Sequence, residues 1–301
     1  MNTFVRSCVA AMLFAAAGTA GATLCVFATV PEWGALAGEL GGDKVKIYVA
    51  TTAAQDPHHV EARPSLIARA RNADLVVATG AELEAGWLPL VLQQAGNASV
   101  RPGQRGYFEA AAFVTLLDKP RRLDRADGDV HAAGDPHIQT DPRNIARVAA
   151  ALAVRLAEVD PANADTYRAR HKAFDEKWRA AIARWEREGA PLKGTPIVVQ
   201  HKAFTYLIAW LGLDTVATLE PKPGVEPTTA SLTEVLALLQ RKPAKMVLRA
   251  AYQGDRASLW LAERAKLVPV VLPFTVGGSP EAKDLYALFD DTIARLLKGA
   301  Q

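Results

Sequence analysis

Three histidines stand where predicted strands end or a predicted helix begins, and imidazole is a common metal ligand. His58 follows the run VKIYVAT, His201 ends the run TPIVVQH, and His137 lies before a predicted helix in GDPHIQTDPRN. Open α/β sheets bind ligands in loops at the carboxyl ends of strands. The three positions are far apart in the sequence and the chain has no HExxH motif, so the fold must assemble any metal site. Taken singly, each histidine is equally typical of a hydrogen-bonded loop.

Short apolar runs separated by helical patterns predict the elements that position these histidines. In the first half, LCVFATV, VKIYVAT and DLVVATG are typical of buried strands, and PEWGALAGELGG and PSLIARARNA are typical of helices. After residue 190, the strand patterns TPIVVQH, KMVLRAAY and VPVVLPF alternate with predicted helices over 203–210, 231–240 and 259–265. Such alternation indicates βαβ units. We therefore expect an α/β fold with two α/β lobes and largely parallel sheets.

A long helical segment separates the two halves. Pro142 fits the first turn of a helix, and the Asp160-Pro161 pair marks a helix boundary. The stretch from Pro161 to Gly189 predicts one helix of about 27 residues, roughly 40 Å long. On it, Trp178 and Trp185 form an apolar stripe that we expect to face the lobes. A rigid backbone helix between two lobes predicts a cleft whose walls rock only slightly.

The chain therefore divides into four predicted regions. Residues 1–22 form a signal peptide, 23–141 the N-terminal α/β lobe, 142–190 the connecting helices with the long spine helix, and 191–301 the C-terminal α/β lobe. In the signal, Arg6 precedes a small and apolar run, and Ala20-Gly21-Ala22 fits a signal-peptidase site. The alternative is a membrane anchor, but the apolar stretch is shorter than the roughly 20 residues that span a bilayer. We expect cleavage near Ala22 and a periplasmic protein.

The charge balance excludes one large class of function. The chain has 301 residues, with 35 Lys and Arg against 32 Asp and Glu, which gives a formal net charge of +3. That charge is too small to produce the field with which a dedicated nucleic-acid binder neutralises phosphates. We expect no nucleic-acid partner.

Several motifs, taken in order, resemble those of the metal-binding solute receptors of zinc and manganese ABC importers. They are DPHHVEARPS at 56–65, ADLVVATGAELEAGWL at 73–88, Pro136-His137 followed by DP at 141–142, and HKAFTY at 201–206. The resemblance covers nearly the whole chain after the signal. It implies two α/β lobes, a spine helix and a single metal site in the interlobe cleft. Carried over one by one, the family's first three ligands fall on His58, His137 and His201.

The chemistry of these ligands favours zinc. Neutral imidazole nitrogen suits Zn²⁺, whereas a manganese site favours more carboxylate oxygens. Family members with a carboxylate at the third ligand position are typically manganese receptors, and this chain has His201 there. The resemblance implies delivery of Zn²⁺ to a membrane permease. Because this chain has no Walker lysine motif, the ATPase of that importer must be a separate chain. A metallochaperone could load the site, and we expect a monomer that is not an enzyme.

The chain departs from the family at the fourth ligand. Many relatives place an Asp in the loop after the last strand, but this loop reads LPFTVGGSP and contains no acid. The fourth position could be held by water, by Glu61 or by Asp255. An open position on zinc is typical of catalytic sites, and in a receptor it could ease release of the ion.

A second departure concerns the segment before His137. Zinc receptors of this family often carry a long insertion there, rich in histidine and acids, whereas this chain has only RRLDRADGDVHAAGDPH. Asp127, Asp129 and His131 are a reduced version that collects metal weakly, or else part of a solvated polar loop. His59 is adjacent to a predicted ligand and belongs at most to the shell around the site.

Three other functions are compatible with the same residues. One is a receptor for manganese or for a chelated metal, and another is a metal-dependent adhesin on the same scaffold. The third is a zinc hydrolase with an open three-histidine site, which would need a base such as a glutamate beside the ligands.

Overall fold

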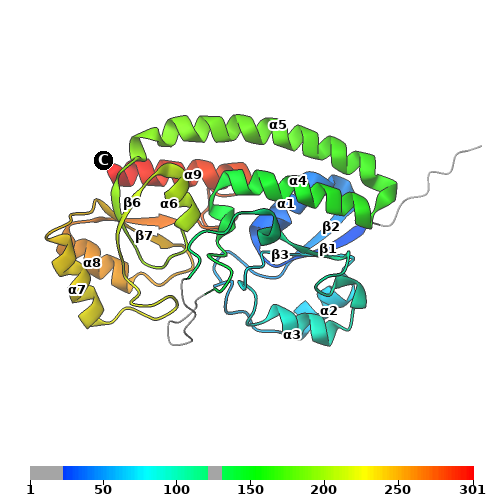
Figure 1. Cartoon of the computed structure of the whole chain (residues 1–301), viewed down its shortest axis with the longest axis horizontal. Helices are drawn as coiled ribbons and strands as arrows, with labels where there is room; N and C mark the ends of the chain where they lie inside the picture. The colour runs from blue at the N-terminus through cyan, green and yellow to red at the C-terminus, as the bar shows by residue number, and fades with distance from the viewer. Residues whose placement is uncertain (1–22, 121–130) are drawn as a thin grey trace, which may run out of the picture.

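Two parallel sheets of four strands each form the centre of the molecule (Figure 1). The computed structural model describes residues 23–120 and 131–301. The predicted signal peptide and the acids Asp127 and Asp129 lie outside the described residues. The first sheet has the order β2-β1-β3-β4, and its strands are β1 Leu24–Ala28, β2 Val45–Val49, β3 Leu75–Ala78 and β4 Tyr107–Glu109. The second has the order β6-β5-β7-β8, with β5 Pro196–Val199, β6 Asp214–Thr218, β7 Met246–Ala250 and β8 Val268–Leu272.

The two sheets share one topology although their sequences show no repeat. In each sheet the first strand lies between the second and the third, and every pairing is parallel. The apolar runs predicted six of these strands. The sequence patterns did not predict β4 and β6, which are both edge strands. β4 has only three residues, and β6 begins with two exposed polar residues, so neither carries a run of buried apolar side chains.

Helices cover both faces of each sheet. Around the first sheet lie α1 Pro31–Gly41, α2 Pro64–Arg71 and α3 Leu88–Ala95, and around the second lie α6 Thr205–Leu211, α7 Thr229–Leu239, α8 Arg256–Ala265 and α9 Leu285–Ala300. In Figure 1, α2 and α3 lie on the lower side of the first sheet, and α7 and α8 lie at the outer end of the second. The predicted α/β fold with two parallel-sheet lobes is therefore confirmed.

The connecting segment consists of α4 Pro142–Val159 and α5 Ala164–Gly189. The spine α5 has 26 residues and follows a 3-10 turn over Pro161–Asn163, so the predicted long helix is confirmed. It arches over both sheets in Figure 1. Trp178 Nε1 donates to the carbonyl oxygen of Pro142 at 2.8 Å, and Trp185 Nε1 donates to Asp290 Oδ1 at 2.6 Å. Both indoles are fully buried, so the predicted stripe joins α5 to α4 and to α9.

One apolar core joins the two lobes. It contains side chains of both sheets and of the helices between them, for example Leu75 on β3, Trp178 on α5 and Leu248 on β7. Two smaller clusters cover the other face of each sheet, one around Val76 with α2 and α3, the other around Val247 with α7 and α8. Each sheet is thus buried on both faces, as expected for parallel strands.

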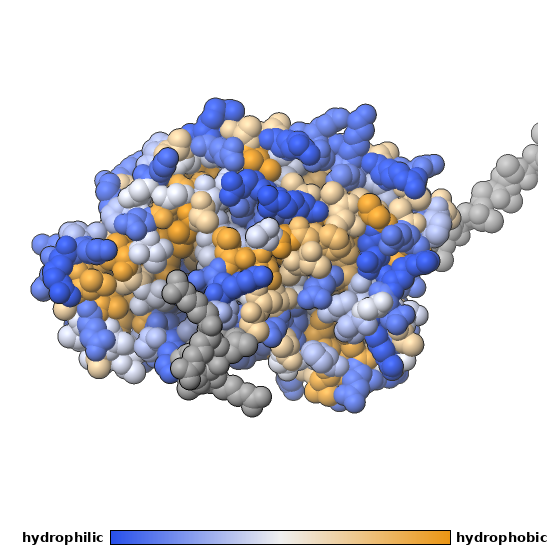
Figure 2. All heavy atoms as spheres, in the orientation of Figure 1, coloured by the Kyte–Doolittle hydropathy of each residue, from blue (hydrophilic) through white to orange (hydrophobic). Residues whose placement is uncertain are grey.

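The outer surface is polar where the spine lies. Figure 2 shows hydrophilic side chains along the upper edge, over α5. The buried positions of α5 recur along one face, which leaves its charged residues in water. Within residues 23–120 and 131–301, no helix is both long and apolar enough to cross a membrane.

Candidate metal centre

The three predicted histidine ligands lie side by side. The ring centroids of His58 and His137 are 5.2 Å apart, those of His137 and His201 are 5.6 Å apart, and those of His58 and His201 are 6.1 Å apart. With Zn–N bonds of about 2.0–2.1 Å and tetrahedral angles, imidazole centroids on one zinc lie roughly 5 Å apart. The rings are therefore arranged around a space of nearly the right size for one ion.

The three histidines are slightly too far apart to bind one ion together. Among the described residues, no group of three or more His, Cys, Asp and Glu side chains has the geometry to hold a metal as it stands. The two centroid distances that involve His201, 5.6 Å and 6.1 Å, are wider than the tetrahedral value. A small movement of His201 toward His58 and His137 would bring the three rings to the spacing expected around one zinc ion.

Two of the histidines are held by the same local motif. His58 follows β2 in the tripeptide Asp56-Pro57-His58, where Asp56 Oδ1 accepts from the backbone N–H of His58 at 2.9 Å and lies 2.8 Å from its Nδ1. Asp135-Pro136-His137 repeats this geometry, with both distances 2.8 Å. An aspartate two residues before a histidine can accept from both groups because the proline fixes the turn between them. The motif therefore sets the orientation of each ring.

The third histidine is oriented by a more distant acid. His201 directly follows β5 and Gln200, and its Nδ1 lies 2.6 Å from Oε2 of Glu220, which follows β6. Since a carboxylate only accepts, Nδ1 carries a proton in all three rings, and in the neutral form of each ring Nε2 keeps its lone pair. The Nε2 atoms of His58 and His137 are buried and have no hydrogen-bond partner among the described residues. Carboxylates that fix the tautomer in this way are typical of metal-ligating histidines.

The charge states of these groups differ with their surroundings. Burial lowers the pKa of His137 despite the opposing charge of Asp135, so this ring is neutral near pH 7. Burial also acts to lower the pKa of His201, but the hydrogen bond and charge of Glu220 outweigh it and the pKa is raised. Burial acts to raise the pKa of Asp56, but the hydrogen bonds and charge of His58, together with the charge of His59, outweigh it and bring the pKa to about 2. Burial likewise acts to raise the pKa of Asp135, but the charge and hydrogen bonds of His137 outweigh it and the pKa is lowered. Asp56 and Asp135 are thus ionised and attract the imidazole protons.

The site opens into a cleft of about 500 Å³. His131, His137 and His201 lie along its wall, and Lys119, Lys202 and Lys222 lie around it. Lys202 Nζ pairs with Asp118 Oδ2 at 3.1 Å. The cleft therefore combines imidazoles with a rim that carries lysines.

A fourth histidine lies beside the first three. The ring of His131 is 5.3 Å from that of His58, within the range of the predicted ligands. The ring of His59 is 6.3 Å from that of His58, which places it next to the site. Glu61 and Asp255 are exposed, and neither has a hydrogen bond or ion pair with the three histidines in the described parts of the chain.

The loop after β8 has a different role in this chain. Thr275 stands in the loop where many relatives place an acid, and its hydroxyl donates to Oε2 of Glu32 at 2.5 Å. Both side chains are buried. This residue is therefore used in a contact between the lobes.

Sequence reasoning missed the acids that orient the rings. The tripeptide DPH occurs twice, which is a signal that could have identified Asp56 and Asp135. Glu220 lies 19 residues after His201, and only the pairing of β5 with β6 brings the two together.

Two lobes of parallel sheet on a helical spine, with three acid-oriented histidines at one cleft, define a class of metal-binding solute receptors. The sequence pattern of the family described as ZnuA, zinc-uptake complex component A, periplasmic, matches residues 26–299. The match covers most of the chain, so the chain belongs to this family, and the resemblance drawn from its motifs is confirmed.

Curated relatives agree with this membership. The zinc-binding lipoprotein AdcA of Streptococcus pneumoniae is 24% identical over 228 residues, which are 74% of this chain and 44% of AdcA. The high-affinity zinc uptake system protein ZnuA of Bacillus subtilis is 22% identical over 246 residues, 80% of this chain and 75% of that protein. The manganese receptor lipoprotein PsaA of S. pneumoniae is 24% identical over 212 residues, 67% of this chain and 64% of PsaA. The chain spans less than half the length of AdcA.

Solved structures share the fold. A crystal structure of ZnuA superposes with a TM-score of 0.77 at 22% identity, covering 93% of this chain and all of that chain. FpvC from Pseudomonas aeruginosa in complex with Mn²⁺ gives 0.76 at 21% identity, covering 92% of this chain and 99% of the other. At these identities the likeness supports the two-lobe architecture alone.

Proposed function

We propose that this chain is an exported solute-binding protein that captures Zn²⁺ and delivers it to the permease of an ABC importer. The observation that carries this proposal is the set of three buried imidazoles that lie side by side, each with its Nδ1 on a carboxylate. The family membership and the zinc-related names of AdcA and ZnuA support it.

His58, His137 and His201 are the ligands in this proposal. His58 and His137 come from the region 23–141 and His201 from 191–301, while the helices of 142–190 hold the two regions at a fixed spacing. An ion bound to all three would draw His201 toward the other two rings and narrow the cleft slightly. Imidazole nitrogen favours Zn²⁺ over Mn²⁺, for which carboxylate oxygens are preferred.

The fourth ligand in this proposal is His131. Its ring lies beside that of His58 and on the wall of the same cleft as His137 and His201. A complete set of four imidazoles would bind zinc in a closed site, whereas water in the fourth position would leave it open. Metal-edge spectroscopy of the zinc-loaded protein would give four nitrogen ligands for the first arrangement and three for the second.

The surroundings of the site support binding rather than catalysis. A zinc hydrolase needs a base beside the metal-bound water. The carboxylates next to the rings within the described residues, Asp56, Asp135 and Glu220, are all engaged with Nδ1 atoms. In this proposal the protein is a monomeric periplasmic receptor, not an enzyme, and its partner is a permease whose ATPase is another chain. The proposal includes a metallochaperone that donates the zinc ion to this protein.

Zinc titration of the metal-free protein by calorimetry tests the proposal. His58→Ala and His201→Ala each remove a ligand, so we expect zinc to bind more than about 100-fold more weakly. His171→Ala, on α5 and outside the cleft, is the matched control and should bind zinc as the unaltered protein does. Unchanged affinity in both ligand variants would contradict the assignment.

The lysines at the cleft favour a second candidate, a receptor for a chelated metal. Lys202 pairs with Asp118, while the positive charge of Lys119 at the cleft would attract an anionic complex. Titration with Zn²⁺ alone and with preformed zinc citrate separates the two. Tighter binding of the citrate complex, lost on Lys119→Gln, would favour the chelate.

A further inference from the structure

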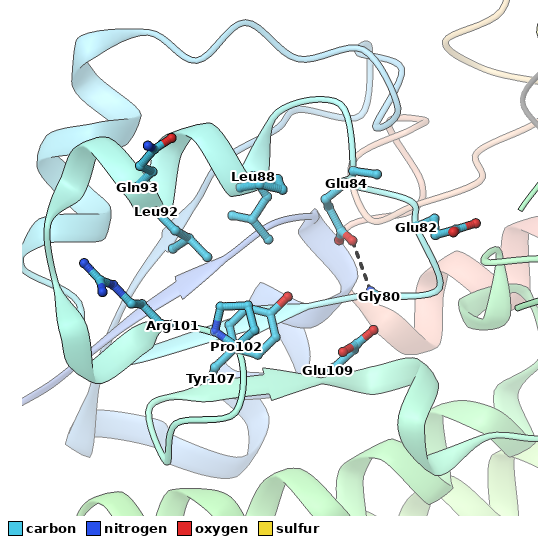
Figure 3. Close-up of a pocket in the computed structure, with 12 residues that line it drawn as sticks. Gly80, Glu82, Glu84, Leu88, Leu92, Gln93, Arg101, Pro102, Tyr107 and Glu109 are labelled. Carbon is cyan, nitrogen blue, oxygen red and sulfur yellow. Dashed lines mark hydrogen bonds between the residues drawn. The ribbon is translucent and has the colours of Figure 1, made fainter. Parts of the chain in front are cut away.

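A second cavity lies in the N-terminal lobe, between α3 and β4 (Figure 3). Its volume is about 550 Å³, similar to that of the metal cleft, and it contains none of the histidines. Its lining is mostly apolar, and Figure 3 shows charged groups on opposite sides. Pockets of this size and composition typically bind small organic molecules.

One end of the cavity is acidic. Gly80 donates its N–H to Glu84 Oε2 at 3.0 Å, and the other oxygen of Glu84 accepts from Thr29 Oγ1 and from the N–H of Thr79. Glu109 Oε1 accepts from the N–H of Ala81 at 3.3 Å. The Glu84 carboxylate is therefore fully used by the protein, while Oε2 of Glu109 has no donor among the described residues.

Gly80 is what allows the two acids to lie together. A β carbon at this position would lie 2.1 Å from Cγ of Glu109, and the residue has a φ of +79°. Only glycine combines this conformation with such a close neighbour. The packing of Glu109 against Gly80 holds its carboxylate at the cavity, as Figure 3 shows.

The middle of the cavity is apolar with one free hydroxyl. Leu88 and Leu92 of α3 form one wall, and Pro102 and the ring of Tyr107 face them. The hydroxyl of Tyr107 makes no hydrogen bond to any residue that the structure describes. Burial, together with the charges of Glu84 and Glu109, raises the pKa of Tyr107. This hydroxyl therefore keeps its proton and can donate it to a ligand.

The opposite end is basic. Arg101 and Gln93 lie on the side of the cavity away from Glu109 (Figure 3). Arg101 is exposed and makes no ion pair within the described residues. Its guanidinium is therefore available for a carboxylate, which it binds well through two parallel hydrogen bonds.

We propose that this cavity binds a short apolar peptide of two or three residues. The peptide's terminal ammonium would pair with Glu109, its terminal carboxylate would pair with Arg101, and its apolar side chains would pack between Leu88, Leu92 and Pro102. A free peptide has charges of the required sign at its two ends and an apolar stretch between them. A single amino acid carries both charged groups on its α carbon, with no apolar stretch between them. This site is independent of the proposed metal function.

Calorimetry with leucyl-leucine, on the full chain in metal-free and zinc-loaded form, tests this proposal. We expect one site per chain, with affinity falling at least about tenfold in Arg101→Gln and in Glu109→Gln, because each removes a charge-assisted hydrogen bond. Arg105→Gln, an exposed arginine of the same loop outside the cavity, is the matched control and should bind the peptide normally.

End-blocked peptides decide which residue binds which terminus. N-acetyl-leucyl-leucine should bind the unaltered protein and Glu109→Gln equally, and leucyl-leucinamide should bind the unaltered protein and Arg101→Gln equally. The absence of peptide binding, equal binding by Arg101→Gln and Arg105→Gln, or the opposite assignment of the ends would overturn the proposal. Arg101→Gln should bind zinc as the unaltered protein does, and this result would show that the variant is folded. Loss of peptide binding can then be told apart from loss of zinc binding.

Discussion

Each of the three predicted ligands, His58, His137 and His201, is paired with one carboxylate. Asp56 and Asp135 stand two residues before their histidines, and Glu220 approaches His201 from the neighbouring strand. The pairing makes Nε2 more basic, and in His58 and His137 this atom has no hydrogen-bond partner among the described residues. Three separate loops thus present the same chemical group to one space.

Removal of one orienting acid should weaken zinc binding without removing a ligand. In Asp135→Asn the neutral amide cannot stabilise His137 as a carboxylate does, so we expect the zinc affinity to fall about 10- to 100-fold. The control is Asp214→Asn, an exposed aspartate on β6. Calorimetric zinc titration of both variants provides the measurement, and equal affinities would show that Asp135 does not support the site.

The residue types and their positions at strand ends, together with the family resemblance, were enough to predict that the three histidines lie close together. The sequence did not indicate the fourth ligand that we propose, because Thr275, which donates to Glu32, stands where an acid was expected after the last strand. His131 comes close to His58 only through the path of the chain before His137. Such a contact between distant loops has no local pattern in the sequence.

At the scale of elements, the spine and the two sheets were predicted because their signals are local. A run of helix formers without an internal proline predicts α5, and buried apolar runs predict six strands. The predictions omitted α3, which lies within the run TGAELEAGWLPLVLQQA, and α9. The edge strands β4 and β6 depend on pairing with a neighbour, so their own residues contain little sign of them.

The contact of α5 with α4 should contribute measurably to the free energy of unfolding. Trp178 is fully buried and donates to the carbonyl oxygen of Pro142. We expect Trp178→Ala to lower the free energy of unfolding by about 3–5 kcal/mol, since it leaves a cavity and an unpaired carbonyl group. Its neighbour Arg179, with a side chain 74% exposed, is the matched control.

Chemical denaturation of the two variants tests this expectation. Arg179→Ala should change the free energy of unfolding by less than about 0.5 kcal/mol. If Trp178→Ala lowers the free energy of unfolding no more than Arg179→Ala does, then the contact of Trp178 with α4 does not stabilise the spine.

At the scale of the whole molecule, a buried acid links the lobes. Glu32, in the first turn of α1, accepts from Thr275 after β8, and its side chain is 1% exposed. Burial raises the pKa of Glu32 to about 7; the hydrogen bond from Thr275 opposes this shift and the charge of Glu84 adds to it. The carboxyl is thus protonated in the folded state over a range of pH where it is ionised in the unfolded chain.

This acid should make the fold less stable as the pH rises. Between pH 4.5 and about 7 the folded state binds more protons at Glu32 than the unfolded state does, so the free energy of unfolding falls through this range. Above pH 7 the free energy of unfolding is lower by roughly 3 kcal/mol than it is below pH 4.5. Glu32→Gln keeps an acceptor for Thr275 without the charge, so it should resemble the unaltered protein at pH 5 and exceed its stability at pH 8.

Urea denaturation at pH 5 and pH 8 measures the difference. Glu39→Gln, an exposed acid of the same helix, should leave the pH dependence unchanged. If Glu32→Gln differs from the unaltered protein by the same amount at both pH values, the acid is not the source of the pH dependence.

The shared core has a consequence for how the chain is made. α9, the last helix, packs on α5 and on α1, so the apolar core that covers the first sheet contains side chains from residues 285–296. A chain emerging from the ribosome cannot complete this core until almost its last residue is available. Until then, the apolar surfaces of α1 and α5 that α9 covers stay exposed to water.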